Sequence, residues 1–187
     1  QFDKAKARGD ELLAISEQLG DEDLKFEALH HRWGFAYFMG QTAKILDYTS
    51  RGVNRYDPQR HHRFSYTFGG HDPGVCAHCC RATAFGLAGN VAKIKPELEA
   101  AMALSHRLQH PLTLVFAQSS ACHALYFSRD TDASQASAEQ LVLSASKYDL
   151  PVFGAIGSFW LGATRAMRGD PTGGLQQMEP TFEPTHG

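Results

Sequence analysis

The chain has 187 residues, of which 43% are hydrophobic and 20% charged, and its formal net charge at pH 7 is -2. This length supports one domain with a sizeable core, and the balanced charge lacks the basic field of nucleic-acid binders. The sequence contains neither an apolar run of about 18 residues nor the start of a signal peptide. We therefore expect a cytoplasmic protein whose partners include neither nucleic acid nor membrane.

The four cysteines fit a reducing compartment. Three of them are crowded into residues 76–80, a spacing that does not suit a disulfide framework. The sequence begins at Gln1 inside a predicted helix and stops soon after another helix should begin. These ends predict a fragment of a longer protein.

The first part of the chain predicts an alternation of outer and inner helices. Residues 3–20 place Leu12, Ile15 and Leu19 on one stripe, which is typical of an outer helix whose partner would precede Gln1. Residues 23–40 then predict an inner helix, packed on both sides, and residues 41–56 predict its outer partner.

Residues 56–71 form a loop that is dense in histidine, arginine and aromatic residues. In one interpretation the loop is structural, and its aromatics anchor it to the helices. In the other it binds a partner, because a cluster of cationic side chains would recognise an acidic group. The candidate binding residues of the loop are Tyr56, Arg60, His61 and His71.

The segment HDPGVCAHCC, residues 71–80, predicts the start of an inner helix, with Asp72 as its cap and a proline in its first turn. Cys76, Cys79 and Cys80 then suit close helix packing. In the alternative, Cys76 and Cys79 share a face and bind a metal together with His71 or His61. A second C-x-x-C or H-x-x-x-H pair is missing, so packing is the preferred interpretation and no cofactor is expected.

The rest of the chain repeats with a step of 40 residues. Pro111 and Pro151 begin predicted inner helices, and turn signals at 89–90, 129–130 and 169–170 keep the same step. The outer stripe is Val91, Ile94, Leu98, Ala101, Ser105 and Leu108, and its last four positions map onto Ala138, Leu141, Ala145 and Tyr148. A final helix is expected from Pro171, with Pro180 and Pro184 arguing against its continuation.

Two features of each unit resemble the tetratricopeptide repeat. One is a small residue before the turn with a branched residue five positions later, as at Gly40 and Ile45. The other is an aromatic residue shortly before the turn, namely Tyr37, Phe85 and Tyr126. The resemblance implies an all-α fold over residues 1–187, in which antiparallel helix hairpins form a right-handed α-α superhelix.

The segments LGDEDLKFEALHHRWGFAYFMGQ, YDPQRH and HDPGVC resemble a particular group of such repeats. They are similar to the repeat region that follows an ATPase module in bacterial class III adenylate/guanylate cyclases. No catalytic residue of that family carries over, because this sequence has neither a phosphate loop nor the metal-binding aspartates of a cyclase.

The register of the inner helices predicts a concave, aromatic groove with few charges. Its candidate binding residues are His30, Tyr37, Phe116, His123, Tyr126 and Phe159. Stacked repeats use such a surface to hold peptides or other domains, although the same aromatics would equally fill a tightly wound core.

We expect a non-catalytic interaction module that binds a protein or peptide, including the ATPase and cyclase domains of its own parent protein. A small-molecule or metal sensor that uses the groove or the Cys/His residues is the second hypothesis. No spacing of Ser, His and Asp or of paired carboxylates predicts a catalytic site. Self-association is also expected, because the end repeats would expose unfinished apolar faces.

Overall fold

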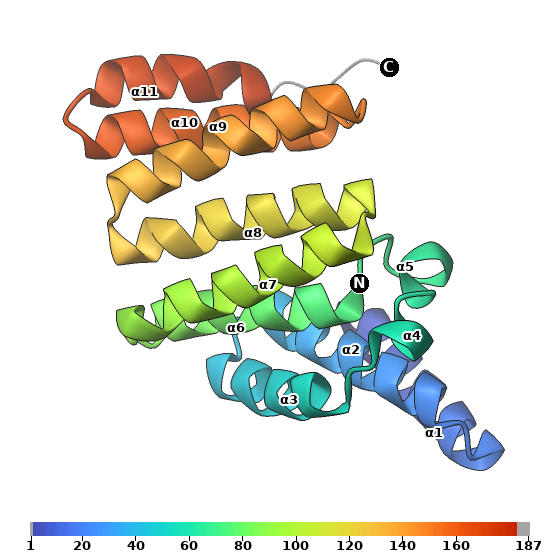
Figure 1. The fold of residues 1–187 in the computed structure, drawn as a ribbon. Helices are drawn as coiled ribbons and strands as arrows, with labels where there is room; N and C mark the ends of the chain where they lie inside the picture. The colour runs from blue at the N-terminus through green and yellow to red at the C-terminus, as the bar shows by residue number, and fades with distance from the viewer. Residues whose placement is uncertain (1, 183–187) are drawn as a thin grey trace.

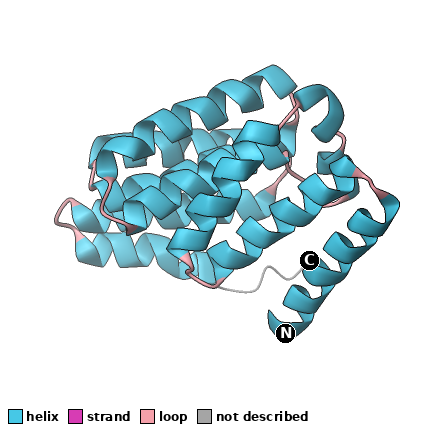
Figure 2. Cartoon of the chain, turned by 90° about the horizontal axis from the view of Figure 1, so that it is seen from below, coloured by secondary structure: helices cyan, strands magenta, loops and turns pink. Residues whose placement is uncertain are grey.

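The computed structural model describes residues 2–182, and every element in this range is a helix (Figures 1 and 2). The expected all-α class is therefore confirmed for the described part of the chain. Gln1 and the tail from residue 183, which contains Pro184, lie outside the described residues. Within residues 2–182, no helix has the length and apolar character that crossing a bilayer requires.

Two long helix pairs and two short helices make up the N-terminal part. In chain order they are α1 (Phe2–Leu19), α2 (Glu22–Phe38), α3 (Thr42–Arg55), α4 (Pro58–His61), α5 (Phe64–Thr67) and α6 (Pro73–Leu87). The short helices α4 and α5 occupy the segment that was expected to be an inserted loop.

Up to residue 182, the C-terminal part continues with four long helices, one shorter helix and two 3-10 turns. They are η1 (Val91–Lys93), α7 (Ile94–Leu108), α8 (Pro111–Ser128), α9 (Thr131–Lys147), α10 (Pro151–Met167), α11 (Pro171–Met178) and η2 (Glu179–Phe182). The first residues of α8 and α10 lie forty positions apart, and so do those of α9 and α11.

The helices pack in the order of the sequence. From α1 to α3 and from α6 to α11 each long helix contacts the next, and α3 contacts α6 across the short helices. Figure 1 shows this progression from α1 in blue to α11 in red. The helices α6, α8 and α10 also contact one another in sequence, so they form an inner layer.

Local sequence explains where these helices begin. The helices α6, α8, α10 and α11 start with proline. Proline has no backbone N–H, and it fits this position because N–H groups in the first turn make no intrahelical hydrogen bond. The side chains of Asp72, Asp130 and Asp170 accept backbone N–H groups three residues later, as N-caps do. The glycines at 89 and 169 adopt φ of 73° and 100°, which end the preceding helices in a left-handed turn.

The core of the N-terminal part centres on Trp33 of α2, which is fully buried. Its ring packs edge-on against Phe26, and its Nε1–H donates to the sulfur of Cys76 at 3.4 Å. Gly52 of α3 lies against the same ring, since a Cβ at that position would sit 2.5 Å from it. Trp33 therefore joins α2 to α6 through its Nε1–H and to α3 through its close contact with Gly52.

Two apolar stripes lie differently from the sequence-based expectation. In α7, Ile94, Leu98 and Ala101 are buried as predicted, but Val91 is 44% exposed because it precedes the α-helix, in the turn η1. In α1, Ile15 and Leu19 are 44% and 67% exposed. The buried residues of this helix are instead the small Gly9 and Ser16, and Gly9 lies against His31 of α2.

Candidate functional site

An open groove of about 670 Å³ lies where α1, α2, the segment 67–71, α6 and α8 meet. Its walls are mainly apolar and include Leu12, Phe35, Tyr37, Phe38, Phe68, Cys79, Cys80, Thr83 and Phe116. Phe38 and Phe68 are 77% and 47% exposed, so two aromatic side chains stand at the opening without being covered by the chain itself. Such a concave apolar surface with few polar groups is the usual form of a ligand site.

Three of the predicted groove residues, His30, Tyr37 and Phe116, line this groove. The other three lie further along the inner layer, with His123 and Tyr126 on α8 and Phe159 on α10. The expected groove residues are thus divided between the cavity and an adjoining surface.

That adjoining surface is an aromatic band formed by Tyr37, His123, Tyr126, Phe159 and Trp160. The hydroxyl of Tyr37 lies 2.7 Å from Nδ1 of His123, and the rings of His123 and Trp160 stack at 5.6 Å. Tyr126 and Phe159 contact the same indole at 5.6 and 5.2 Å. Burial lowers the pKa of His123, so the imidazole is neutral and the Tyr37 hydroxyl donates to it.

The floor of the groove contains a Cys/His cluster made of His30, His71 and Cys76. Each contributes one atom capable of binding a metal, and the three atoms all lie within 4.8 Å of one another. They come from different elements: His30 from the middle of α2, His71 from the residue before the cap of α6, and Cys76 from its first turn. Helix packing, and no local motif, brings them together.

His30 is held by a buried carboxylate. Its Nδ1 lies 3.1 Å from both carboxylate oxygens of Glu27, one turn earlier on α2, and both residues are buried. Burial alone would lower the pKa of His30, but the negative charge and hydrogen bond of Cys76, followed by those of Glu27, raise it to about 10. The imidazole therefore binds negative groups on both of its nitrogens.

The cysteines of α6 differ in their acidity. The Cys80 thiol, 3.9 Å away, donates to Cys76 and lowers the pKa of Cys76 well below its usual value, with the nearby His71 and His30 acting in the same direction. Burial raises the pKa of Cys79, whose side chain packs among Val75, Ala101 and Ala117. Cys76 thus lies within 4.8 Å of His71, whereas Cys79 belongs to a separate apolar packing cluster.

His71 occupies an unusual position in the cluster. Its ring stacks on Phe116 with centroids 4.0 Å apart and planes 5° apart, which fixes its orientation. Its Nε2 is buried, and within residues 2–182 it has no hydrogen-bond partner. A buried polar atom without a partner is costly, so this nitrogen calls for an explanation.

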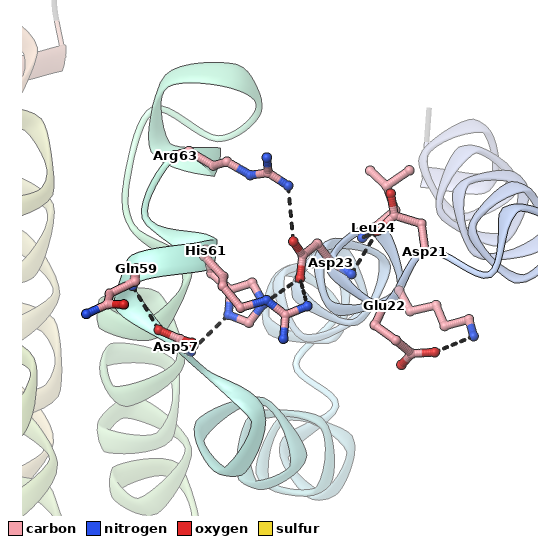
Figure 3. Close-up of polar contacts among 10 residues, drawn as sticks. Asp21, Glu22, Asp23, Leu24, Asp57, Gln59, His61 and Arg63 are labelled. Carbon is pink, nitrogen blue, oxygen red and sulfur yellow. Dashed lines mark hydrogen bonds and ion pairs between the residues drawn. The ribbon is translucent and has the colours of Figure 1, made fainter.

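The segment 57–63 is attached to the N-terminus of α2 through Asp23 (Figure 3). Arg60 and Arg63 approach the two oxygens of this carboxylate at 2.5 and 3.1 Å. His61 is buried, stacks on Phe26 at 4.0 Å, and lies 3.3 Å from the Asp23 carboxylate through Nε2. The arginines and the histidine are therefore paired with the chain's own acid.

Asp72 connects the same segment to α6 and α8. It is completely buried; one oxygen accepts the Val75 N–H, and the other accepts the Tyr56 hydroxyl at 2.8 Å. The second oxygen also lies 3.0 Å from Nδ1 of His62, and the backbone N–H of Asp72 donates to Thr113 Oγ1 at 2.9 Å. This carboxylate fixes the position of the neighbouring His71.

Sequence reasoning did not connect His30 with the cysteines, and it did not single out Asp23 or Trp160. For His30 a signal was present, because Glu27 and His30 are polar side chains three residues apart on a helix expected to be buried. Such a pair on an inner helix indicates a site at which polar groups converge. For Trp160 no comparable signal exists in the sequence.

No protein-family model, curated protein or solved structure matches this chain. The geometry of the groove, the aromatic band and the Cys/His cluster therefore carries the functional argument.

Proposed function

We propose that this chain is a non-catalytic binding module whose groove holds an apolar segment of a partner protein. The observation that carries the proposal is the groove of about 670 Å³, with Phe38 77% exposed at its opening. An aromatic side chain left open to water beside a cavity is typical of a surface that is covered in a complex.

The aromatic band favours a chain-like ligand over a compact one. Tyr37 belongs to both the groove and the band, so the two surfaces are continuous from α2 across α8 to α10. An extended peptide would insert a side chain into the groove and lay the rest of its length along the band. A small apolar molecule would use the groove alone.

We further propose that the helices are tandem hairpins of a right-handed α-α superhelix with units of about forty residues, as in tetratricopeptide-like solenoids. The equal spacing of the starts of α8 and α10 and of α9 and α11 supports this arrangement. Packing of each helix on the next along the chain supports it as well.

In this account the module is the repeat region of a bacterial signalling protein of the adenylate/guanylate cyclase type, working in the cytoplasm. The ATPase and cyclase domains of such a parent are the first partners to consider. Four reduced, buried cysteines are consistent with that compartment. The exposed Ile15 and Leu19 at one end and Leu175 at the other support self-association as a second mode of contact.

Selection from a displayed peptide library tests the groove, followed by fluorescence anisotropy of the peptides that are enriched. We expect peptides with a large apolar residue, and weaker binding to Phe38→Ala. Covering a phenylalanine contributes about 1.5–3 kcal/mol, so the dissociation constant should rise roughly 10- to 150-fold.

The matched control is Leu143→Ala on α9, since Leu143 is also well exposed, at 62%, but does not line the groove. Its affinity should equal that of the wild type. Equal losses in the two variants, or selected peptides without an apolar anchor, would contradict the proposal.

A further inference from the structure

We infer that the floor of the groove is a site for a Zn²⁺-type transition-metal ion, bound by His30, His71 and Cys76, with the fourth position open to the groove. This site is independent of the partner segment proposed above, because its ligands are side chains of this chain alone.

The ligand atoms are close to the required separation. Tetrahedral zinc bonds of roughly 2.0–2.1 Å to nitrogen and 2.3 Å to sulfur place two ligand atoms about 3.3–3.7 Å apart. The three atoms here lie within 4.8 Å of one another. A closure of about 1 Å, within the reach of side-chain rotation, completes the geometry.

His30 has the surroundings of a metal-bound imidazole. Its Nδ1 is 3.1 Å from both oxygens of the Glu27 carboxylate, so Nε2 is the nitrogen available to a metal ion. Histidine ligands commonly give their second nitrogen to a carboxylate, which fixes the ring and strengthens the metal bond. A metal ion also explains why an inner helix buries a glutamate beside a histidine.

His71 supplies a second observation that favours a ligand at this site. Stacking on Phe116 at 4.0 Å holds the ring in place, and Nε2 is buried without a hydrogen-bond partner among the described residues. A metal bond satisfies this lone pair. In the metal-free protein the same nitrogen stays unpaired at a cost in free energy.

Cys76 determines the class of ion. One sulfur and two imidazole nitrogens suit zinc and its softer neighbours, whereas Ca²⁺ and Mg²⁺ take oxygen ligands. Three protein ligands beside an open groove leave the fourth position to water or to a donor atom of a bound molecule.

Titration of the metal-free chain, residues 1–187, with Co²⁺, read by absorption, tests the site. A thiolate bound to Co²⁺ gives a charge-transfer band in the near ultraviolet, and we expect this band at one equivalent and its loss when Zn²⁺ is added. Cys76→Ser should abolish the band, and His71→Ala should weaken binding at least tenfold. Glu27→Gln should weaken it roughly 10- to 100-fold, as for other carboxylates behind a histidine ligand.

Cys79→Ser is the matched control, because Cys79 is a buried cysteine of the same helix that packs in another cluster. It should keep the full band. Absence of the band in the wild type, equal affinity in His71→Ala, or loss of the band in Cys79→Ser would each overturn the inference. Circular dichroism of every variant confirms folding, and His71→Ala keeps the test decisive if Cys76→Ser does not fold.

Discussion

Replacement of Asp72 by alanine tests how the segment 56–71 is held over the groove. The carboxylate is completely buried, caps α6 through the Val75 N–H and accepts the Tyr56 hydroxyl at 2.8 Å. Alanine removes both carboxylate oxygens and leaves the Tyr56 hydroxyl, the His62 imidazole and the first turn of α6 without this partner.

The size of the effect follows mainly from the N-cap and from the hydrogen bond of the Tyr56 hydroxyl. Loss of an N-cap costs about 1 kcal/mol. Loss of a hydrogen bond to a buried charged group costs about 1.5–3 kcal/mol. Together they lower the free energy of unfolding by about 3 kcal/mol, which for a chain of this length lowers Tm by roughly 6–12 °C.

Denaturant unfolding followed by circular dichroism measures this change, with Asp72→Asn as the control. Asparagine keeps one oxygen for the Val75 N–H, so the cap survives and the loss should be smaller by about 1 kcal/mol. A loss below about 1 kcal/mol in Asp72→Ala, or equal losses in both variants, would refute the assigned role of the carboxylate.

Two further predictions concern packing and pH. Gly52→Ala should lower the free energy of unfolding by about 1–3 kcal/mol, because the new methyl group would lie 2.5 Å from the ring of Trp33. Gly34 lies in α2, and an added Cβ there would have nothing within 4 Å. Gly34→Ala should therefore raise the free energy of unfolding by about 0.5–1 kcal/mol. A lower free energy of unfolding in Gly34→Ala, or a higher one in Gly52→Ala, would contradict the packing described. Because burial lowers the pKa of His123 below its unfolded value near 6.5, its contribution to stability is complete above that pH and is lost as the pH falls toward the folded pKa. His123→Asn keeps an acceptor for Tyr37 but does not titrate. Its denaturant midpoint of unfolding should therefore fall less than that of the wild type when the pH is lowered from about 7 to 5. An equal fall of the midpoint in both proteins would refute this.

The helices could be predicted because their signals are local. Asp72 and Asp170, each followed by proline, begin helices in the structure as the sequence indicates. Equivalent buried stripes in α7 and α9, such as Leu98 and Ala138, follow from the 3.6-residue period. Val91 was predicted to be part of its stripe, but the short turn η1 changes the direction of its side chain.

The site depends on contacts that the sequence does not specify. His30 and Cys76 are 46 positions apart, and only the angle between α2 and α6 decides that they meet. Both Cys76 and Cys79 border the groove, but Cys79 also packs against α7 and α8 in a separate apolar cluster. Residue spacing within α6 could not distinguish the two cysteines, since both lie on one side of the helix.

The pairing of the charged residues in the segment 56–71 could not be predicted from the sequence either. Arg60 and His61 were candidates for binding an acidic partner, and in the structure an acid of the same chain, Asp23, occupies them. A pairing across 37 positions leaves no periodic pattern in a single sequence. Packing of distant elements, and not local propensity, therefore determines which charges are available.

Amide NMR of the protein with a selected apolar peptide shows where the peptide binds. We expect the largest chemical-shift changes at residues of the groove and the aromatic band, including Gly34, Phe38 and Phe116. Shifts confined to the outer face of α9 around Leu143, or no saturable shifts with any selected peptide, would contradict this expectation.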